Sequence, residues 1–300
     1  MKKSLLLLPF ALMFALVFTA CEKDDDDDKG SLNLFITDAP IDSDGIESVW
    51  ITIQDLHYQT DQDGWVELGL EEEKKIDLLQ LTRGDYEELG NFELEAGTYN
   101  QIRFMLDAPA FNEGPQENPG CYLEFEDKEP ENLFIPSGYE TGFKGIGTFT
   151  VPINGQVEVT ADWDVRRSVV EAGVTGMYIL KPTIRLVVNN QAGDIQGNVD
   201  NIPEGKDIVI YAYEQGEYDD TEAQDPGAED TRFPNAITSD KVDENNFYHL
   251  AFLAGGAYDL IVTATGEGEF VEVLGVVEDV LVESTETTNE PIVIDELDEL

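Results

Sequence analysis

Basic residues and histidines are both scarce in this 300-residue sequence, and each scarcity excludes a class of function. The 17 Lys and Arg residues face 64 Asp and Glu residues, which gives a formal net charge of −47. Such a field repels nucleic acid, so nucleic-acid binding is excluded, whereas solubility in a salty medium or association with cations is favoured. The two histidines, His57 and His249, are too far apart in sequence for a paired-histidine zinc site. No Gly-x-Ser-x-Gly elbow or Walker loop occurs.

Long apolar runs are also scarce, and the one that is present lies at the N-terminus. The run Leu5–Phe18 follows two lysines and is shorter than a spanning helix, which is typical of a cleavable signal over residues 1–20. Cys21 follows two small residues, and this arrangement resembles the lipobox of bacterial lipoproteins, although Phe18 stands where leucine is commonest. The resemblance implies that Cys21 is lipidated and anchors the chain to membrane lipid. An ordinary secretory signal with a chance cysteine is the alternative.

Residues 21–30 contain a run of five successive carboxylates: Asp24, Asp25, Asp26, Asp27 and Asp28. These charges repel one another and favour a solvated tether. An acidic run behind a lipidated cysteine resembles the export signal of Bacteroidetes surface lipoproteins, which implies an outer-membrane protein facing the cell exterior. Aspartates ending in lysine also resemble a protease site used in recombinant expression, and that alternative stays open. Without the signal, 15 basic residues face 64 acidic ones, a formal charge of −49.

Alternating apolar residues predict an all-β fold of two β-sandwich domains in tandem, at residues 31–188 and 192–295, behind the signal peptide and tether. The alternation from Val49 to Ile53 changes phase afterwards, which predicts a β-bulge near Gln54-Asp55. A polar, glycine-containing break at 189–193 separates the domains. Further strands are expected at 122–125, 147–152, 157–163, 177–188, 194–199, 206–213, 247–252, 257–265 and 270–282. A short helix is expected at 77–81 or 85–89, and a long exposed loop, mobile or functional, at 215–230.

Several segments resemble the bacterial domain-of-unknown-function family 4382 over residues 31–187. They are Thr37-Asp38-Ala39-Pro40, Leu94-x-Ala96-Gly97-x-Tyr99, Ile135-Pro136-Ser137-Gly138, Thr141-Gly142-Phe143-Lys144, Asp162-Trp163-Asp164-x-Arg166-Arg167 and Leu180-Lys181-Pro182-Thr183-Ile184-Arg185. Trp163 stands where phenylalanine is expected. The resemblance implies an envelope lipoprotein and implies no particular activity.

The second domain, residues 192–295, loosely resembles prealbumin-like or carboxypeptidase-regulatory-like sandwiches. The resemblance depends on strand spacing and on a turn that occurs in both halves, Leu94–Tyr99 and Leu253–Tyr258. In each turn a glycine permits the sharp bend and a tyrosine can pack at the edge of a sandwich. This repeated motif favours two similar sandwiches.

Carboxylates supply the candidate chemical sites. Asp162 and Asp164 would lie on one face of a strand, as a glycosidase pair could, but neighbouring arginines favour a structural ion pair. Two Asp-Gly turns could bind calcium through clustered oxygens, although an Asp-rich β-turn is the favoured interpretation. The candidate ligands are Asp42, Asp44, Asp61 and Asp63. No other cofactor is expected.

Two other residue types allow a functional or a structural interpretation. Trp50, Trp65 and Trp163 could form a sugar platform or pack in the core. Cys121 is interpreted as a packed thiol rather than a nucleophile, because neither histidine is near it in sequence. The sequence therefore predicts a non-catalytic surface module for adhesion, glycan capture or assembly with another envelope protein. The alternative is a carboxylate-dependent hydrolase acting on extracellular polysaccharide.

Overall fold

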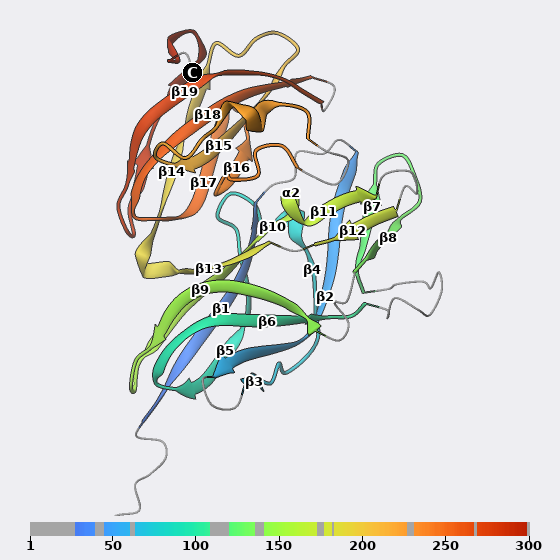
Figure 1. Cartoon of the computed structure of the whole chain (residues 1–300), viewed down its shortest axis with the longest axis vertical. Helices are drawn as coiled ribbons and strands as arrows, with labels where there is room; N and C mark the ends of the chain where they lie inside the picture. Colours follow the sequence, from blue (N-terminus) through green and yellow to red (C-terminus); the bar gives the residue numbers. More distant parts are fainter. Residues whose placement is uncertain are drawn as a thin grey trace, which may run out of the picture.

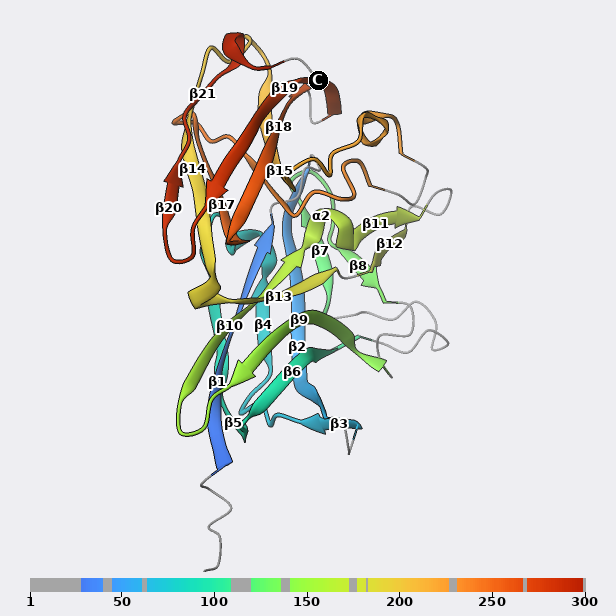
Figure 2. The same cartoon turned by 60° about the vertical axis from the view of Figure 1, so that its left-hand side comes forward.

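The computed structural model describes residues 28–39, 45–60, 64–108, 120–135, 141–172, 177–181, 183–226, 231–266 and 269–298. These residues are mostly strands, with only short helical turns between them (Figure 1). They form an N-terminal unit, residues 29–188, and a C-terminal unit, residues 192–298, at opposite ends of the long axis (Figures 1 and 2). The predicted all-β fold class is confirmed. In the described part of the chain, no helix is long and apolar enough to cross a membrane.

The described residues of the N-terminal unit form one mixed, 13-stranded sheet. Its central path runs β11-β12-β8-β7-β2-β6-β9-β13-β10-β1-β5, and β3 and β4 pair with β2. The strands are β1 (Lys29–Ala39), β2 (Ile46–Thr60), β3 (Gly64–Glu67), β4 (Lys74–Asp77), β5 (Glu87–Glu95), β6 (Gly97–Leu106), β7 (Tyr122–Phe125), β8 (Glu131–Phe134), β9 (Phe143–Val151), β10 (Gln156–Asp164), β11 (Val169–Ala172), β12 (Met177–Leu180) and β13 (Ile184–Val188).

This sheet folds over a single hydrophobic core. Phe104 on β6 and Trp163 on β10 are separated by two strands in the sheet, yet their ring centroids are 5.5 Å apart. Both side chains are fully buried. The apolar residues of β1 and β2 that are fully buried with them are Leu32, Leu34, Ile36, Val49, Ile51, Ile53 and Leu56. The register of β2 against β6 shifts between Ile53 and Asp55, which confirms the predicted β-bulge.

The C-terminal unit contains two four-stranded sheets in the described residues. One consists of β17-β14-β20 with β21 beside β14, and the other runs β16-β15-β18-β19. Their strands are β14 (Ala192–Asp200), β15 (Asp207–Glu214), β16 (Thr238–Lys241), β17 (Phe247–Ala254), β18 (Gly256–Gly266), β19 (Glu269–Val282), β20 (Thr287–Asn289) and β21 (Ile292–Val293). Apolar residues of both sheets share one buried cluster, which makes this unit a β-sandwich.

The repeated turn has the same local structure in both units. Tyr99, near the start of β6, donates its hydroxyl hydrogen bond to the backbone oxygen of Glu95 at 2.8 Å. Tyr258, near the start of β18, donates in the same way to Ala254 at 2.9 Å. Both rings are buried and both bonds reach back four residues, as in the tyrosine corner of β-sandwiches. The repeated six-residue motif therefore predicted a local structure that both units share.

Some local predictions were wrong or incomplete. The expected helix at 77–81 is a 3₁₀ turn, η2 (Leu78–Gln80), whereas 85–89 leads into strand β5. The single strand expected at 177–188 is two strands, because β12 ends at Leu180 and β13 begins at Ile184. The loop at 215–230 contains the 3₁₀ turn η5 (Asp220–Ala223).

The described part of that loop also packs against strand β15 of its own unit. The ring of Tyr218 lies 5.2 Å from that of Tyr213, measured between centroids. The hydroxyl of Tyr213 donates to Glu222 in η5 at 2.9 Å. The described part of the segment is therefore held to the sandwich by side-chain contacts.

Candidate functional site

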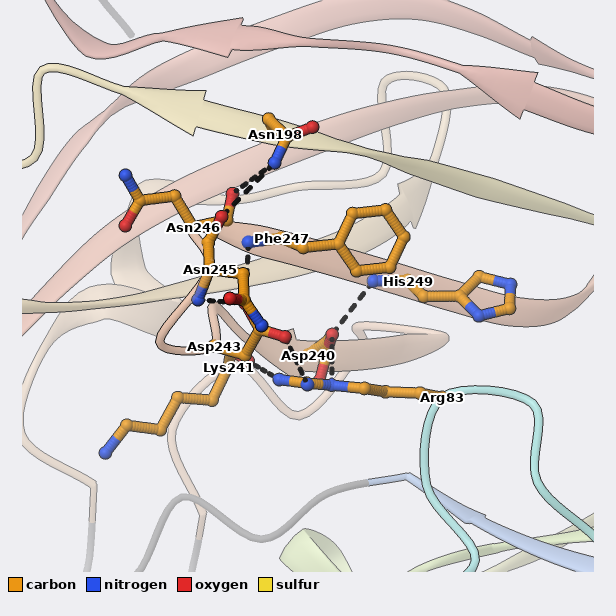
Figure 3. A network of polar contacts seen from close by, with 9 residues as sticks. All are labelled: Arg83, Asn198, Asp240, Lys241, Asp243, Asn245, Asn246, Phe247 and His249. Carbon is orange, nitrogen blue, oxygen red and sulfur yellow. Dashed lines mark hydrogen bonds and ion pairs between the residues drawn. The ribbon is translucent and has the colours of Figure 1, made fainter.

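Among the described residues, a network of charged contacts built around Arg83 joins the two units. This residue lies in the turn between η2 and β5, and its backbone has φ +59°, a left-handed conformation that costs a non-glycine residue about 1 kcal/mol. From this turn its guanidinium reaches into the C-terminal unit, and Nε lies 3.1 Å from both carboxylate oxygens of Asp240 (Figure 3). Nη1 donates to Asp243 at 3.2 Å, and Nη2 donates to the backbone oxygen of Lys241.

Asp240 on β16 is the buried centre of this network. Its side chain is 2% exposed, and it also accepts a hydrogen bond from the backbone N–H of His249 at 2.9 Å. Burial raises the pKa of the Asp240 carboxyl to about 6, although the Arg83 guanidinium and the His249 N–H favour its ionised form. The charge of Asp240 in the native state therefore depends on Arg83.

His249 and Gly84 complete this side of the junction. His249 Nε2 lies 3.4 Å from a carboxylate oxygen of Asp194, and this contact raises the pKa of the imidazole. Gly84 has φ +84°, and a Cβ atom there would lie 3.0 Å from His249 Cε1. Glycine is thus required at position 84 both by the turn and by the close approach of the two units.

A second arginine crosses the junction from the single turn α2 (Val165–Ser168). Arg166 is almost completely buried, and its Nη1 donates to the backbone oxygens of Phe233 at 2.7 Å and Arg232 at 3.1 Å. Its Cζ lies 5.3 Å from the ring centroid of Tyr211 on β15, and its Nη2 donates to Asp164 at 3.1 Å. Arg166 therefore connects the end of β10 to the core of the C-terminal unit.

The two carboxylates considered as a glycosidase pair both belong to this junction. Asp164 binds Arg166, and Asp162 accepts a 2.6 Å hydrogen bond from Nε of Arg185 on the neighbouring strand β13. Both carboxylates are buried. The structural interpretation of the pair is confirmed for Asp164 and Arg166, whereas the partner of Asp162 is Arg185, which pairs with it across the sheet.

A small, mostly polar cavity lies beside Arg83, where residues of the two units meet. It is lined by Thr37, Asp38, Arg83, Gly84, Asp162, Thr238, Ser239, His249, Ala251 and Phe252, and its volume is about 10 Å³. This is room for about one water molecule, compared with the several hundred Å³ of an ordinary small-molecule site. The cavity is too small for an ordinary ligand, and Arg83, Asp162 and His249 at its lining each contact a charged partner.

The other candidate residues are not brought together at this junction. Cys21, Asp24 to Asp27 and the proposed calcium ligands, Asp42, Asp44, Asp61 and Asp63, lie outside the described residues. Asp28 is exposed just before β1. Among the described residues, no group of three or more His, Cys, Asp or Glu is placed to hold a metal ion.

The tryptophans and the cysteine have separate environments. Trp163 packs in the core, whereas Trp50 stacks on Tyr122 and Trp65 lies on β3 beside Arg103. Cys121 is fully buried, and burial raises the pKa of its thiol to about 12. This confirms the interpretation of Cys121 as a packed thiol, because a protonated, buried thiol is a poor nucleophile.

Sequence reasoning missed Arg83. The residue stands in a polar segment next to a glycine, and nothing nearby indicates that its partner is 157 positions away. A basic residue followed by a glycine in a turn is a common surface pattern. Only the three-dimensional arrangement shows it as an anchor.

The fold and the junction define an all-β protein whose two units are joined by arginine–aspartate contacts. Residues 29–182, just over half of the chain, match the family described as "Domain of unknown function (DUF4382)". The chain belongs to this family, which confirms the resemblance seen over residues 31–187. None of the curated proteins matches the chain.

Solved structures with distant similarity to this chain include two pilins and the TIE protein of Bacillus anthracis. The Bacillus anthracis TIE protein has 11% identity and a TM-score of 0.21, over 88% of this chain and 33% of that one. The minor pilin GBS52 of Streptococcus agalactiae has 11% identity and a TM-score of 0.21, over 87% and 94%. BcpA, the major pilin subunit of Bacillus cereus, has 10% identity and a TM-score of 0.22, over 88% and 99%. TM-scores this low support no functional conclusion, and this chain spans only a third of the TIE protein.

Proposed function

We propose that this protein is a lipid-anchored module exposed on the outer membrane, which displays a rigid pair of β units and binds without catalysis. The observation that carries the proposal is the placement of the chain ends. Strand β1 begins at Lys29, eight positions after Cys21, at the end of the long axis opposite the C-terminal unit (Figures 1 and 2). A lipid on Cys21 would hold the N-terminal unit near the bilayer and direct the C-terminal unit outward.

The tether and the junction support a display role. Residues 22–28 can span at most roughly 25 Å, so the folded part would remain close to the membrane. The sequence of five aspartates predicts that charge repulsion would keep this segment in solvent. The contacts of Arg83 with Asp240 and of the buried Arg166 with Phe233 would hold the two units in one orientation, and so present the distal sandwich at a fixed distance from the bilayer.

The ion pairs of the buried carboxylates Asp162 and Asp164 support the proposal that the protein binds without catalysis. Asp162 and Asp164 would have to release Arg185 and Arg166 to act as an acid and a nucleophile. Release of Arg166 would also break its bonds to the C-terminal unit. The proposal would be contradicted if the protein hydrolysed a polysaccharide and the Asp162→Asn variant lost that activity while it kept its fold.

Metabolic labelling with a fatty-acid analogue tests the anchor. Labelling should occur in the wild-type chain and be lost in Cys21→Ser. Unchanged labelling of the variant would overturn the lipid anchor.

A second measurement tests export. Replacement of Asp24 to Asp28 with alanine should leave labelling intact but reduce cleavage by protease added to intact cells. Equal cleavage in both forms would show that the acidic run is only a spacer.

A further inference from the structure

A groove of about 600 Å³ lies on the outer face of β5, β1 and β10, at the end of the N-terminal unit where β1 begins (Figure 2). Its lining includes Lys29, Ser31, Asn91, Glu93, Asn154 and Gln156. Ser31 is directly opposite Glu93 on β5 and Gln156 on β10, so the three side chains share one face of the sheet. The alternating residues Leu32 and Phe92 are buried in the core on the other face. We call this site the amide groove, and its volume is in the range of ordinary ligand sites, roughly 300–1,000 Å³.

The lining of the amide groove has no net charge. Its one acidic residue, Glu93, and its one basic residue, Lys29, form an ion pair of 2.7 Å with each other. The chain as a whole has a formal net charge of −47, so a neutral groove of this size is an exception to its surface chemistry. A charged ligand therefore finds no free counter-charge among the described residues of the lining.

Three side-chain amides in the groove are available to a ligand. Asn91, Asn154 and Gln156 are exposed, and their side-chain amides form no hydrogen bond with any other described residue. Each amide presents an NH₂ donor beside a carbonyl acceptor. Neighbouring hydroxyls of a sugar ring offer the same combination of donor and acceptor, so an amide can bind two of them at once.

The turn that carries Asn154 is fixed to the first strand. Asn154 has φ +52°, and its backbone N–H donates to the backbone oxygen of Lys29 at 2.7 Å. A Cβ atom at Gly30 would overlap the backbone oxygen of Pro152, so glycine is required where the turn crosses β1. The backbone positions of the amides are therefore set before a ligand arrives, which lowers the ordering cost of binding.

We propose that the amide groove binds a neutral oligosaccharide. Asn91 on β5 and Gln156 on β10 would bind sugar hydroxyls from the two sides of β1, and Asn154 would bind them at the end of the groove. The inference rests on the proposed non-catalytic binding function, for which it names a ligand class, and it does not use the lipid anchor.

Three other ligand classes fit the groove less well. Protein partners depend on large aromatic or apolar anchors, and none of the described residues that line the groove has such a side chain. An acidic glycan or a nucleic acid is repelled by the chain and meets only Lys29, which Glu93 already pairs. A metal ion needs several oxygen ligands, and the one carboxylate of the lining belongs to the same ion pair.

An array of neutral hexasaccharides of glucose, mannose and galactose tests the proposal, with hexasaccharides of the corresponding uronic acids printed beside them. The chain from Cys21 onward, which contains all the described residues, should bind at least one neutral hexasaccharide and none of the acidic ones. Calorimetric titration with the bound hexasaccharide should give the same affinity at low and at physiological salt, because no ion pair forms on binding.

Single substitutions locate the site. Asn91→Ala and Gln156→Ala should each weaken binding about fivefold, which corresponds to about 1 kcal/mol of lost hydrogen bonding. Asn289→Ala is the matched control, because it removes an exposed amide from β20 of the C-terminal unit, and it should change the affinity less than twofold. All three residues are exposed, so the thermal midpoint should stay at the wild-type value and separate ligand binding from folding.

Failure to bind any neutral hexasaccharide, or wild-type affinity in both Asn91→Ala and Gln156→Ala, would overturn the proposal. An affinity that falls steeply with salt would also overturn it, since the ligand would then be held by charge. Release of shorter sugars from the bound hexasaccharide would contradict the non-catalytic function but not the site. Fatty-acid labelling of Cys21 is measured separately, so the failure of one proposal can be told from the failure of the other.

The sugar can belong to a free glycan or to the head group of a glycolipid. Vesicles that contain digalactosyldiacylglycerol distinguish these sources, with vesicles of phosphatidylcholine alone as the control. Binding to the glycolipid vesicles that is weakened by Asn91→Ala would assign the groove to a head group. Binding of the soluble hexasaccharide alone would assign it to a free glycan.

Discussion

Removal of the Arg83 side chain should weaken the junction by an amount that depends on pH. At pH 8 the Arg83→Ala variant leaves the Asp240 carboxylate, 2% exposed, without its cation. Breaking a buried ion pair costs about 3–5 kcal/mol, and we expect about 3 kcal/mol because the side chain of Arg83 is 31% exposed. At pH 5 the carboxyl of Asp240, with a pKa of about 6, is largely protonated already, so we expect only about 1 kcal/mol.

Differential scanning calorimetry at the two pH values measures this difference. For a chain of this size, 3 kcal/mol lowers the midpoint by about 6–12 °C, and loss of coupling should separate the two units into distinct transitions. Lys241→Ala is the matched control: it removes an exposed ion pair with Asp207 next to the same site, which should cost 0–1 kcal/mol at either pH. Arg83→Gly should be about 1 kcal/mol less damaging than Arg83→Ala, because glycine relieves the left-handed backbone. An equal cost for Arg83→Ala at pH 5 and pH 8 would refute the reasoning.

Four other outcomes are expected, three from the contacts described above and one from the Asp-Gly turns of the sequence. Asp240 and His249 have pKa values raised in the native state, so the stability they contribute is present at acidic pH and lost as pH rises through their native pKa values, near 6 for Asp240. Asp240→Asn should therefore flatten the pH dependence of unfolding between pH 4 and 7, and a variant curve parallel to the wild type would exclude Asp240 as its source. Tyr99→Phe and Tyr258→Phe should each cost about 1 kcal/mol in chemical denaturation, and a loss confined to one of them would show that the two turns are not equivalent. Arg166→Met should reduce resistance to proteolysis between the units, whereas unchanged cleavage would deny Arg166 an anchoring role. Millimolar calcium should raise the thermal midpoint no more than magnesium at matched ionic strength, and a calcium-specific rise lost with the Asp-Gly turns would reveal a real site.

Local patterns predicted the features that local forces determine. The phase change after Ile53 located the bulge, because the apolar side chains must return to the core face after an inserted residue. The two Leu-x-[Ala/Gly]-Gly-x-Tyr turns predicted matching corners, since the glycine and the tyrosine act within a few residues. Both features are encoded by neighbours in sequence.

Long-range pairing could not be predicted in the same way. Strand β1 pairs in parallel with β10, more than a hundred residues later, and only the final sheet order shows it. The contact of Arg83 with Asp240 likewise has no local signature. An arginine in a polar turn and an aspartate at the end of a strand are ordinary surface residues until the two units meet. The partner of Asp162 was missed for the same reason, because Arg185 is a cross-strand neighbour.

The position of β1 determines how this protein would respond to a pulling force. The strand lies inside the sheet, with nine register pairs to β10 and eight to β5. If the chain is held at Cys21 and a load is applied to the distal unit, tension enters β1 at Lys29 and runs along the strand axis. The two ladders are then loaded in shear, so their hydrogen bonds share the force instead of opening one after another. A chain anchored through an edge strand pulled sideways would unzip at a much lower force.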